Sequence, residues 1–177
     1  AFVEAYQRVQ PLRIGELWAI PIMLRLALIE NLRRVSASVT AGRRDRELAV
    51  EWASKLIEVS TNEPANIVIV LAELVRSGLE LSDPFVTELA SRLQGQGPAL
   101  GFATSWLEQR LAEQGETIEH LQVRVSHDQA AAQVAVSNSI GSLRSLGAID
   151  WRDFVEAVGL VEHELTRDPS GVYAKMD

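Results

Sequence analysis

The chain has 177 residues, of which 47% are hydrophobic, and its 17 Lys and Arg against 24 Asp and Glu give a formal net charge of -7 at pH 7. This length is sufficient for one globular domain with a buried core. The absence of cysteine excludes disulfide scaffolds and cysteine-built zinc sites. The acidic balance argues against a general nucleic-acid binder, because neutralising phosphates requires a basic surface.

The charge is unevenly distributed along the chain. Residues 1–60 carry nine basic and seven acidic side chains, whereas residues 61–177 carry eight and seventeen. All the basic residues except Lys55 and Lys175 are arginines, whose planar guanidinium groups hold carboxylates or phosphates through two hydrogen bonds. The N-terminal third could therefore face an anionic partner, although a codon bias towards arginine explains the same composition.

The two ends of the sequence resemble cuts in a longer polypeptide. The first residue is not Met, no signal peptide precedes the first helix, and the residues from Val172 onward end without a turn or cap. We therefore expect an excised piece of a larger protein. The longest strongly apolar uncharged run, Leu17 to Leu24, is far shorter than the ~20 residues that a membrane-spanning helix needs.

The N-terminal part of the chain is expected to contain three helices. Apolar residues at helical spacing predict a short helix up to Gln10, with Phe2, Tyr6 and Val9 on one face. A turn follows, and Pro21 is expected in the first turn of a helix that runs to about Ala41. Gly42 is the predicted stop, and the next helix runs from Arg43 to about Ser60.

Three prolines mark the starts of further helices: Pro64, Pro84 and Pro98 each precede an apolar run. The clearest N-terminal cap of these three helices is expected at Asp83, before Pro84. A helix of roughly thirty residues is predicted from about Glu116 to Leu146, where apolar residues recur every three or four positions.

A last helix, capped by Asp150, is predicted to run to about Thr166, before a turn at residues 168–171. The dense β-branched cluster at residues 67–70 lies inside a helical pattern, and no hairpin signal is present. The sequence therefore predicts an all-α fold, with residues 1–177 forming a single bundle-like domain of about seven helices.

The stretch from Leu17 to Leu32 is the most unusual part of the sequence. Residues 20–29 are apolar almost all round the helix apart from Arg25, which predicts burial on several sides. A buried guanidinium must be paired, and Glu16 and Glu30 are the nearby candidates; the alternative is an anion site shared with another domain. The candidate interface or ion-pair network comprises Glu16, Trp18, Arg25, Glu30, Arg33 and Arg34.

Two other features have both a structural and a binding interpretation. The tryptophans at positions 18, 52, 106 and 151 lie on or beside apolar stripes, so core packing is favoured over sugar-stacking platforms. The small, amide-rich middle of the long helix favours tight helix packing, or else a docking face that includes Gln129, Gln133 and Asn138.

No complete catalytic or metal-binding pattern is recognisable. His120 and His127 are seven residues apart, whereas metal-binding pairs on a helix need spacings of three or four. Asp150 and Asp153 lie at a helix start, where acidic groups stabilise the helix dipole. Neither a phosphate-binding glycine loop nor a nucleophile elbow occurs. We therefore predict no catalytic, cofactor-binding or metal-binding residue.

Two blocks of sequence resemble the cyclic β-1,2-glucan synthases of Gram-negative bacteria. The first is the whole stretch from Ile14 to Arg34. The second comprises residues 133–140, 142–144, 150–151 and 161–162 together with the C-terminal run 168–177. Residues 106–108 between the blocks are compatible with the family, so the resemblance spans essentially the whole chain.

The resemblance implies a helical region upstream of a family-84 glycosyltransferase core. Such synthases are very large inner-membrane enzymes that use UDP-glucose and a divalent metal to make periplasmic cyclic glucans. We therefore expect a noncatalytic accessory domain, on the cytoplasmic side of the inner membrane, whose partners are other domains of the same polypeptide. A glucan-binding module within the same enzyme is the alternative, and a lone helical protein with coincidental similarity is a third interpretation.

Overall fold

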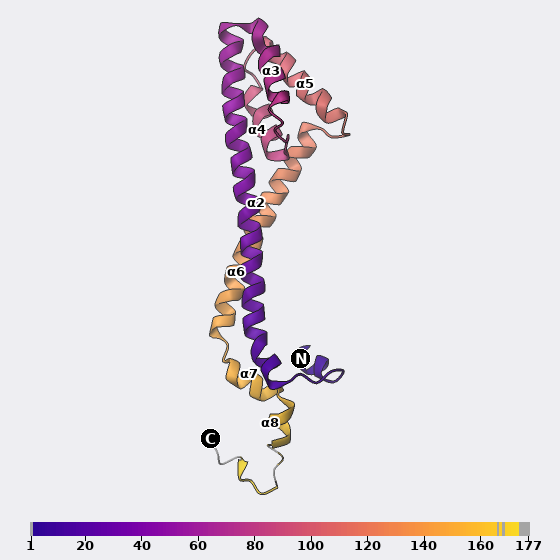
Figure 1. Cartoon of the computed structure of the whole chain (residues 1–177), viewed down its shortest axis with the longest axis vertical. Helices are drawn as coiled ribbons and strands as arrows, with labels where there is room; N and C mark the ends of the chain where they lie inside the picture. Colours follow the sequence, from indigo (N-terminus) through magenta and orange to yellow (C-terminus); the bar gives the residue numbers. More distant parts are fainter. Residues whose placement is uncertain (1, 166, 168, 174–177) are drawn as a thin grey trace. The chain divides into compact units, whose positions relative to one another are not determined.

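The computed structural model describes residues 2–165, 167 and 169–173, and all the regular structure within this part of the chain is helical. The predicted all-α class is therefore confirmed. The described residues form eight α-helices (Figure 1): α1 Phe2–Gln7, α2 Ile14–Asn62, α3 Ile67–Arg76, α4 Asp83–Leu93, α5 Gly101–Ala112, α6 Ile118–Ala148, α7 Trp151–Val158 and α8 Leu160–Leu165.

The contacts within the chain divide it into two units. Unit 1 consists of Ala1–Arg33 and Ala135–Asp177, and unit 2 of Arg34–Val134. The long helices α2 and α6 each contribute residues to both units. The single domain of residues 1–177 stays a prediction, and the two units are described separately below.

The predicted boundaries around Pro21 and Gly42 are wrong, because α2 runs unbroken from Ile14 to Asn62. Pro21 removes one backbone hydrogen bond, but Leu17 before it is only 2% exposed and anchors the first turns of the helix in the core of unit 1. Gly42 lies inside this helix and does not adopt a positive φ. Tertiary packing thus overrides two local breakers.

Two of the three proline-marked starts begin with a short 3₁₀ turn. The turns Pro64–Asn66 and Pro98–Leu100 lead directly into α3 and α5. The third start differs from the prediction by one residue, because the N-cap of α4 is Ser82 and Asp83 is the first helical residue. The Ser82 hydroxyl donates a hydrogen bond to Asp45 of α2 at 2.6 Å, so it ties two helices of unit 2 together.

The C-terminal elements follow the prediction more closely. The long helix α6 matches the predicted span to within two residues at each end. Asp150 caps α7, its side chain accepting hydrogen bonds from the backbone N–H groups of Arg152 and Asp153. The predicted last helix is interrupted at Gly159, where a Cβ would lie 2.8 Å from the carbonyl oxygen of Val155. Thr166 and Asp168 lie outside the described residues.

Unit 2 contains the main hydrophobic core. Ala49, Ala53 and Leu56 of α2 are fully buried in a cluster with residues of α3, α4 and α5. Phe85, at 1% exposure, is the largest side chain in this cluster. Small alanines on α2 let the shorter helices approach it closely, and the three helices lie beside this part of α2 in Figure 1.

Unit 1 has a smaller core made by Leu17, Val155 and Val158, with Val3 and Phe154 packed against it. The predicted apolar face of the first helix is wrong, because Phe2, Tyr6 and Val9 are all exposed. The buried residue of α1 is the polar Gln7, whose side-chain amide donates to the carbonyl oxygen of Val158 at 2.7 Å. This hydrogen bond and the packing of Val3 therefore hold the short helix, and the apolar pattern did not indicate either contact.

Replacing Gly42 by Ala should stabilise the protein. The new Cβ would make ordinary van der Waals contact with Pro84 Cγ at 3.5 Å. Alanine also removes the entropic cost of glycine in a helix, so we expect a gain of about 0.5–1 kcal/mol in the free energy of unfolding. Urea denaturation followed by circular dichroism measures this gain.

The matched control is Gly115→Ala. Gly115 has open space around it but a φ of 74°, which disfavours any residue with a Cβ. This variant should lose about 1–2 kcal/mol. Equal effects of the two substitutions would contradict the assignment of Gly42 to an uninterrupted helix.

Candidate functional site

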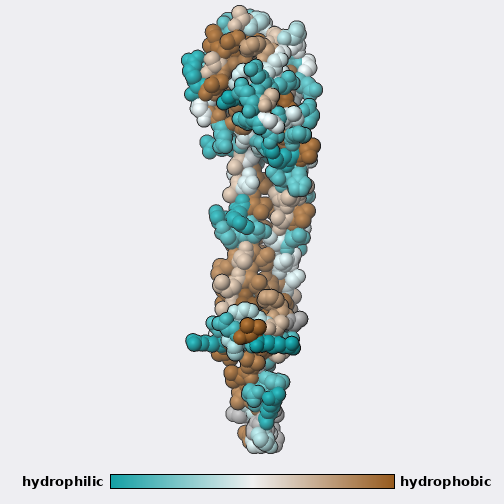
Figure 2. All heavy atoms as spheres, turned by 90° about the vertical axis from the view of Figure 1, so that its right-hand side faces the viewer, coloured by the Kyte–Doolittle hydropathy of each residue, from teal (hydrophilic) through white to brown (hydrophobic). Residues whose placement is uncertain are grey.

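An apolar stripe runs along the outer side of α2 in unit 1. Trp18, Ile22, Leu26 and Ile29 recur every three or four residues, which places them on one helical face. They are 44%, 58%, 55% and 54% exposed, so the predicted burial of this stretch is wrong for the described chain. Figure 2 shows brown, hydrophobic side chains gathered along this part of α2. We call these four residues the α2 stripe.

The opposite side of α2 faces α6 within unit 1. Leu24, Ala27 and Leu28 of α2 line an open groove of about 770 Å³ together with small polar residues of α6. The α6 residues of this groove include Ser137, Asn138, Gly141 and Ser145. The amide-rich stretch of α6 thus borders an open groove here, and the choice between tight packing and a docking face stays a prediction.

Arg25 is exposed rather than buried. One of its terminal nitrogens (Nη2) donates to the backbone carbonyl of Leu146 on α6, at 3.4 Å. The two predicted carboxylate partners are engaged elsewhere. Glu16 accepts a hydrogen bond from the backbone N–H of Arg13 at 2.7 Å, and Glu30 is paired with Arg33. The ion-pair network predicted around a buried Arg25 therefore does not form as expected.

Glu30 and Arg33 form a two-pronged ion pair on the surface of α2. Both Nε and Nη2 of Arg33 lie 2.7 Å from the carboxylate oxygens of Glu30. The hydrogen bond and the negative charge of Glu30 raise the pKa of Arg33 above its usual value. Side-chain exposures of 67% and 52% leave this pair solvated, so it orders the helix surface more than it stabilises the fold. Arg34, the first residue of unit 2, is also exposed.

A buried polar contact joins α2 and α6 in unit 1. Asn31 donates through its side-chain amide to the hydroxyl of Ser139 at 3.0 Å, and Ser139 is only 3% exposed. A polar pair between the two helices penalises shifted registers, because a shift would leave the buried Ser139 hydroxyl without this partner. The sequence analysis did not single out this pair.

The three amide residues predicted as one docking face are distributed over both units. Gln129 lines a groove of about 360 Å³ in unit 2, together with Asp45, Arg46 and Pro84. Gln133 is exposed in the same unit. Asn138 lines the unit 1 groove.

The four tryptophans occupy different environments. Trp52 and Trp106 pack partly buried against the unit 2 core, and Lys55 lies 4.6 Å above the Trp52 ring. Trp151 donates through its indole nitrogen to the carbonyl of Leu146 at 2.9 Å. Trp18 alone among the four is classed as exposed, and it belongs to the α2 stripe.

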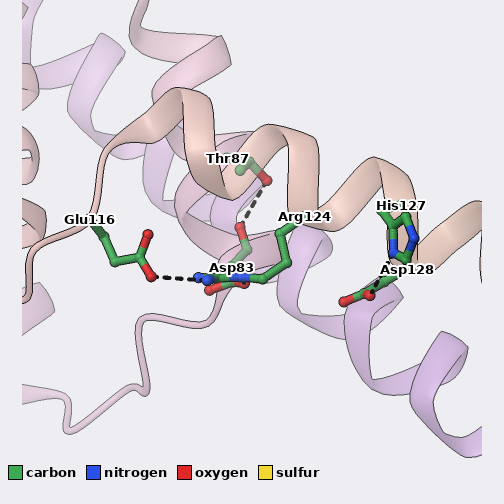
Figure 3. Close-up of polar contacts among 6 residues, drawn as sticks. All are labelled: Asp83, Thr87, Glu116, Arg124, His127 and Asp128. Atoms are coloured by element: carbon green, nitrogen blue, oxygen red, sulfur yellow. Dashed lines mark hydrogen bonds and ion pairs between the residues drawn. The ribbon is translucent and has the colours of Figure 1, made fainter.

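Arg124 is the centre of a charge cluster in unit 2 that the sequence analysis missed (Figure 3). It extends from α6 between two carboxylates, with Nε 2.5 Å from Asp83 and Nη1 2.9 Å from Glu116. The hydrogen bonds to Asp83 and Glu116 raise the pKa of Arg124 above its usual value. The guanidinium thereby connects the start of α4 to the start of α6. Further along α6, the exposed His127 lies 3.8 Å from Asp128.

A cleft beside α5 is the second feature that sequence reasoning missed. It has a volume of about 590 Å³ and lies entirely in unit 2. Trp106, Gln109 and Arg110 of α5 form one side, and the loop before α4 contributes Leu79 and Glu80. The sequence did contain a signal for this cleft, because the polar residues Gln109 and Arg110 lie three and four positions after Trp106, on the same helical face.

Within the described part of the chain, His, Asp and Glu do not form a cluster of three or more that could hold a metal ion. None of the helices in that part has the length and hydropathy needed to cross a bilayer.

The comparisons with known proteins identify one informative similarity. Over all its 177 residues the chain is 34% identical to the cyclic beta-(1,2)-glucan synthase NdvB of Rhizobium meliloti (strain 1021), and it spans 6% of that protein's length. Neither a family model nor a solved structure matches the chain. The resemblance predicted from the two sequence blocks is therefore confirmed, and it extends through the region between them.

Removing Arg124 should weaken unit 2 in a salt-dependent way. In Arg124→Met, Asp83 and Glu116 lose their common counter-ion, so we expect a lower midpoint of urea unfolding at low salt. The difference from the unchanged protein should shrink in 1 M NaCl, where the Debye length is about 3 Å. Arg92→Met, which removes a surface pair within α4, is the control and should have a smaller effect. A salt-independent loss in Arg124→Met would show that packing of the side chain, rather than its charge, matters.

The pair Asn31 and Ser139 should be coupled in a double-mutant cycle. We expect Asn31→Ala and Ser139→Ala to show an interaction energy of about 1 kcal/mol, because each single change removes the same hydrogen bond. Chemical denaturation of the two single variants and the double variant measures it. Strictly additive effects would contradict the proposed role of this contact.

Proposed function

We propose that this chain is a noncatalytic helical segment of a cyclic β-1,2-glucan synthase, which holds neighbouring domains of the same polypeptide through the α2 stripe. Two observations together support the proposal. The chain is similar to a glucan synthase along all its own residues, and one apolar face of α2 is left exposed by the described residues. A helix that is apolar on two opposite sides normally has protein on both.

The size of the relative supports a partner within the same polypeptide. The chain spans only 6% of the synthase that it resembles. A protein of that length contains ample further sequence to cover the α2 stripe. Exposed apolar residues in a row are typical of interaction sites, whereas isolated ones are common on any surface.

The parent enzyme would be a UDP-glucose-dependent glucosyltransferase that requires a divalent metal. We place its metal and nucleotide sites outside this segment, because the sequence contains no phosphate-binding glycine loop and the described residues contain no cluster of three or more His, Asp or Glu that could hold a metal ion. We further propose that the parent is an inner-membrane protein of a Gram-negative bacterium, with this segment on the cytoplasmic side. These proposals follow from the family resemblance, and nucleic acid is not among the proposed partners.

The test compares two pairs of substitutions in the parent synthase. Ile22→Gln with Leu26→Gln removes apolar surface from the α2 stripe without touching the core of unit 1. We expect the purified segment to retain its unfolding midpoint, whereas the full synthase should lose yield, protease resistance and glucan synthesis together. The segment alone should transfer no glucose from UDP-glucose.

The matched control is Val68→Gln with Val123→Gln, at positions of unit 2 that are 55% and 70% exposed. This control should leave the synthase unchanged. A synthase that tolerates the change in the α2 stripe equally well would overturn the docking role, and glucosyl transfer by the isolated segment would overturn the noncatalytic assignment.

The alternative function, a glucan-binding module, is favoured by one specific observation: the cleft of unit 2 that contains Trp106.

A further inference from the structure

The cleft beside α5 is large enough for a small ligand and has a mixed apolar and polar lining. Its volume of about 590 Å³ falls within the range of 300–1,000 Å³ that is common for ligand pockets. Leu74 of α3 and Leu79 of the following loop form an apolar wall, and Trp106 lies in the same lining. Polar side chains of α5 and of the turn after it complete the site.

Trp106 is held in place by the core. Its side chain is only partly buried, and it packs against the main hydrophobic cluster while also lining the cleft. Core packing and ligand contact are therefore compatible for this residue. An aromatic ring that the fold already immobilises loses little conformational entropy when a ligand stacks on it.

The polar groups of the cleft suit hydroxyl groups. Gln109 and Gln114 each offer an amide that can donate and accept hydrogen bonds, as adjacent sugar hydroxyls require. Arg110 and Glu113 lie in the same lining and pair with each other at 3.0 Å, which fixes a charged donor and acceptor side by side. A sugar ring combines an apolar C–H face with polar edges, and this matches a tryptophan flanked by amides.

The charge of the cleft disfavours an anionic ligand. Glu80 and Glu113 contribute two carboxylates, whereas Arg110 is the cation in this lining and is already paired with Glu113. A nucleotide diphosphate would place its phosphates near these carboxylates. The cleft is therefore better suited to a neutral polyhydroxylated ligand than to a sugar nucleotide.

We propose that this cleft binds a short stretch of neutral β-linked glucan, with Trp106 as the stacking surface and with Gln109 and Gln114 as hydrogen-bonding groups. The choice of glucan over another neutral sugar rests on the proposed function, whereas the preference for a neutral sugar rests on the cleft itself. The cleft and the α2 stripe belong to different units.

The experiment titrates the purified chain with linear β-1,2-linked glucose oligomers up to about 10 mM, a range that covers weak single-site binding. Two-dimensional amide NMR locates the response, and tryptophan fluorescence follows it. We expect saturable shifts at Gln109, Gln114 and the loop of residues 79–81. An absence of shifts over this range would overturn the proposal, as would shifts centred on Trp18.

Two variants test the assigned roles. Gln109→Ala with Gln114→Ala alters exposed amides and should weaken binding about tenfold or more, since each loses a hydrogen bond to the ligand. Trp106→Leu should abolish detectable binding while circular dichroism checks that the helices remain. The control is Gln129→Ala with Gln133→Ala, which removes two exposed amides from another part of unit 2 and should leave binding unchanged. Unaltered binding in Gln109→Ala with Gln114→Ala would overturn the assignment.

Three competitors separate this inference from the proposed function. Tighter binding of UDP than of the oligomers at the cleft would overturn the preference for a neutral ligand. Equal binding of α-1,4-linked and β-1,2-linked glucose oligomers would keep a sugar site but overturn the assignment to a β-linked glucan. Cellulose oligomers serve as the β-1,4-linked comparison. None of these outcomes depends on the α2 stripe, whose role is tested in the full synthase, so the two proposals fail independently.

Discussion

The burial of one face of α2 is the constraint on which the described structure depends. A helix of 49 residues gains little from backbone hydrogen bonds alone, because those bonds replace bonds to water. Its stability comes from contacts along its length: Ala49, Ala53 and Leu56 in the core of unit 2, and Leu17 in the smaller core of unit 1. The shorter helices α3, α4 and α5 are arranged around the first of these surfaces.

The sequence predicted well those helices that have a periodic apolar pattern over many residues or a distinctive capping residue. The thirty-residue pattern identified α6, and Asp150 identified the start of α7. The wrong boundaries at Pro21 and Gly42 have a common cause. Each residue type tends to end a helix, but placing it inside a helix costs only a few kcal/mol of stability. Packing of Leu17 before Pro21, and of Pro84 beside Gly42, outweighs that preference and is visible only in three dimensions.

The candidate interface illustrates a different limit. Apolar residues all round α2 correctly indicated an unusual segment, but the sequence could not say which side the chain itself covers. The structure places Leu28 in the groove beside α6 and leaves Ile22 and Leu26 exposed on the opposite side. Arg25 likewise donates to a backbone carbonyl rather than to Glu16 or Glu30. Both carboxylates have closer partners: Glu16 accepts from a backbone N–H at the helix start, and Glu30 pairs with the arginine three residues further along.

The α2 stripe and the Trp106 cleft show why residue type alone cannot separate packing from binding. Trp18 and Trp106 both lie beside apolar helical stripes, so their sequence contexts are alike. Trp18 is exposed among aliphatic side chains, which favours a protein surface as its partner, because aliphatic residues offer no hydrogen bonds to a sugar. Trp106 is fixed by the core and bordered by amides and charges, which favours a small polar ligand. The side chains around each indole, rather than the indole itself, therefore favour a protein partner for the α2 stripe and a small polar ligand for the Trp106 cleft.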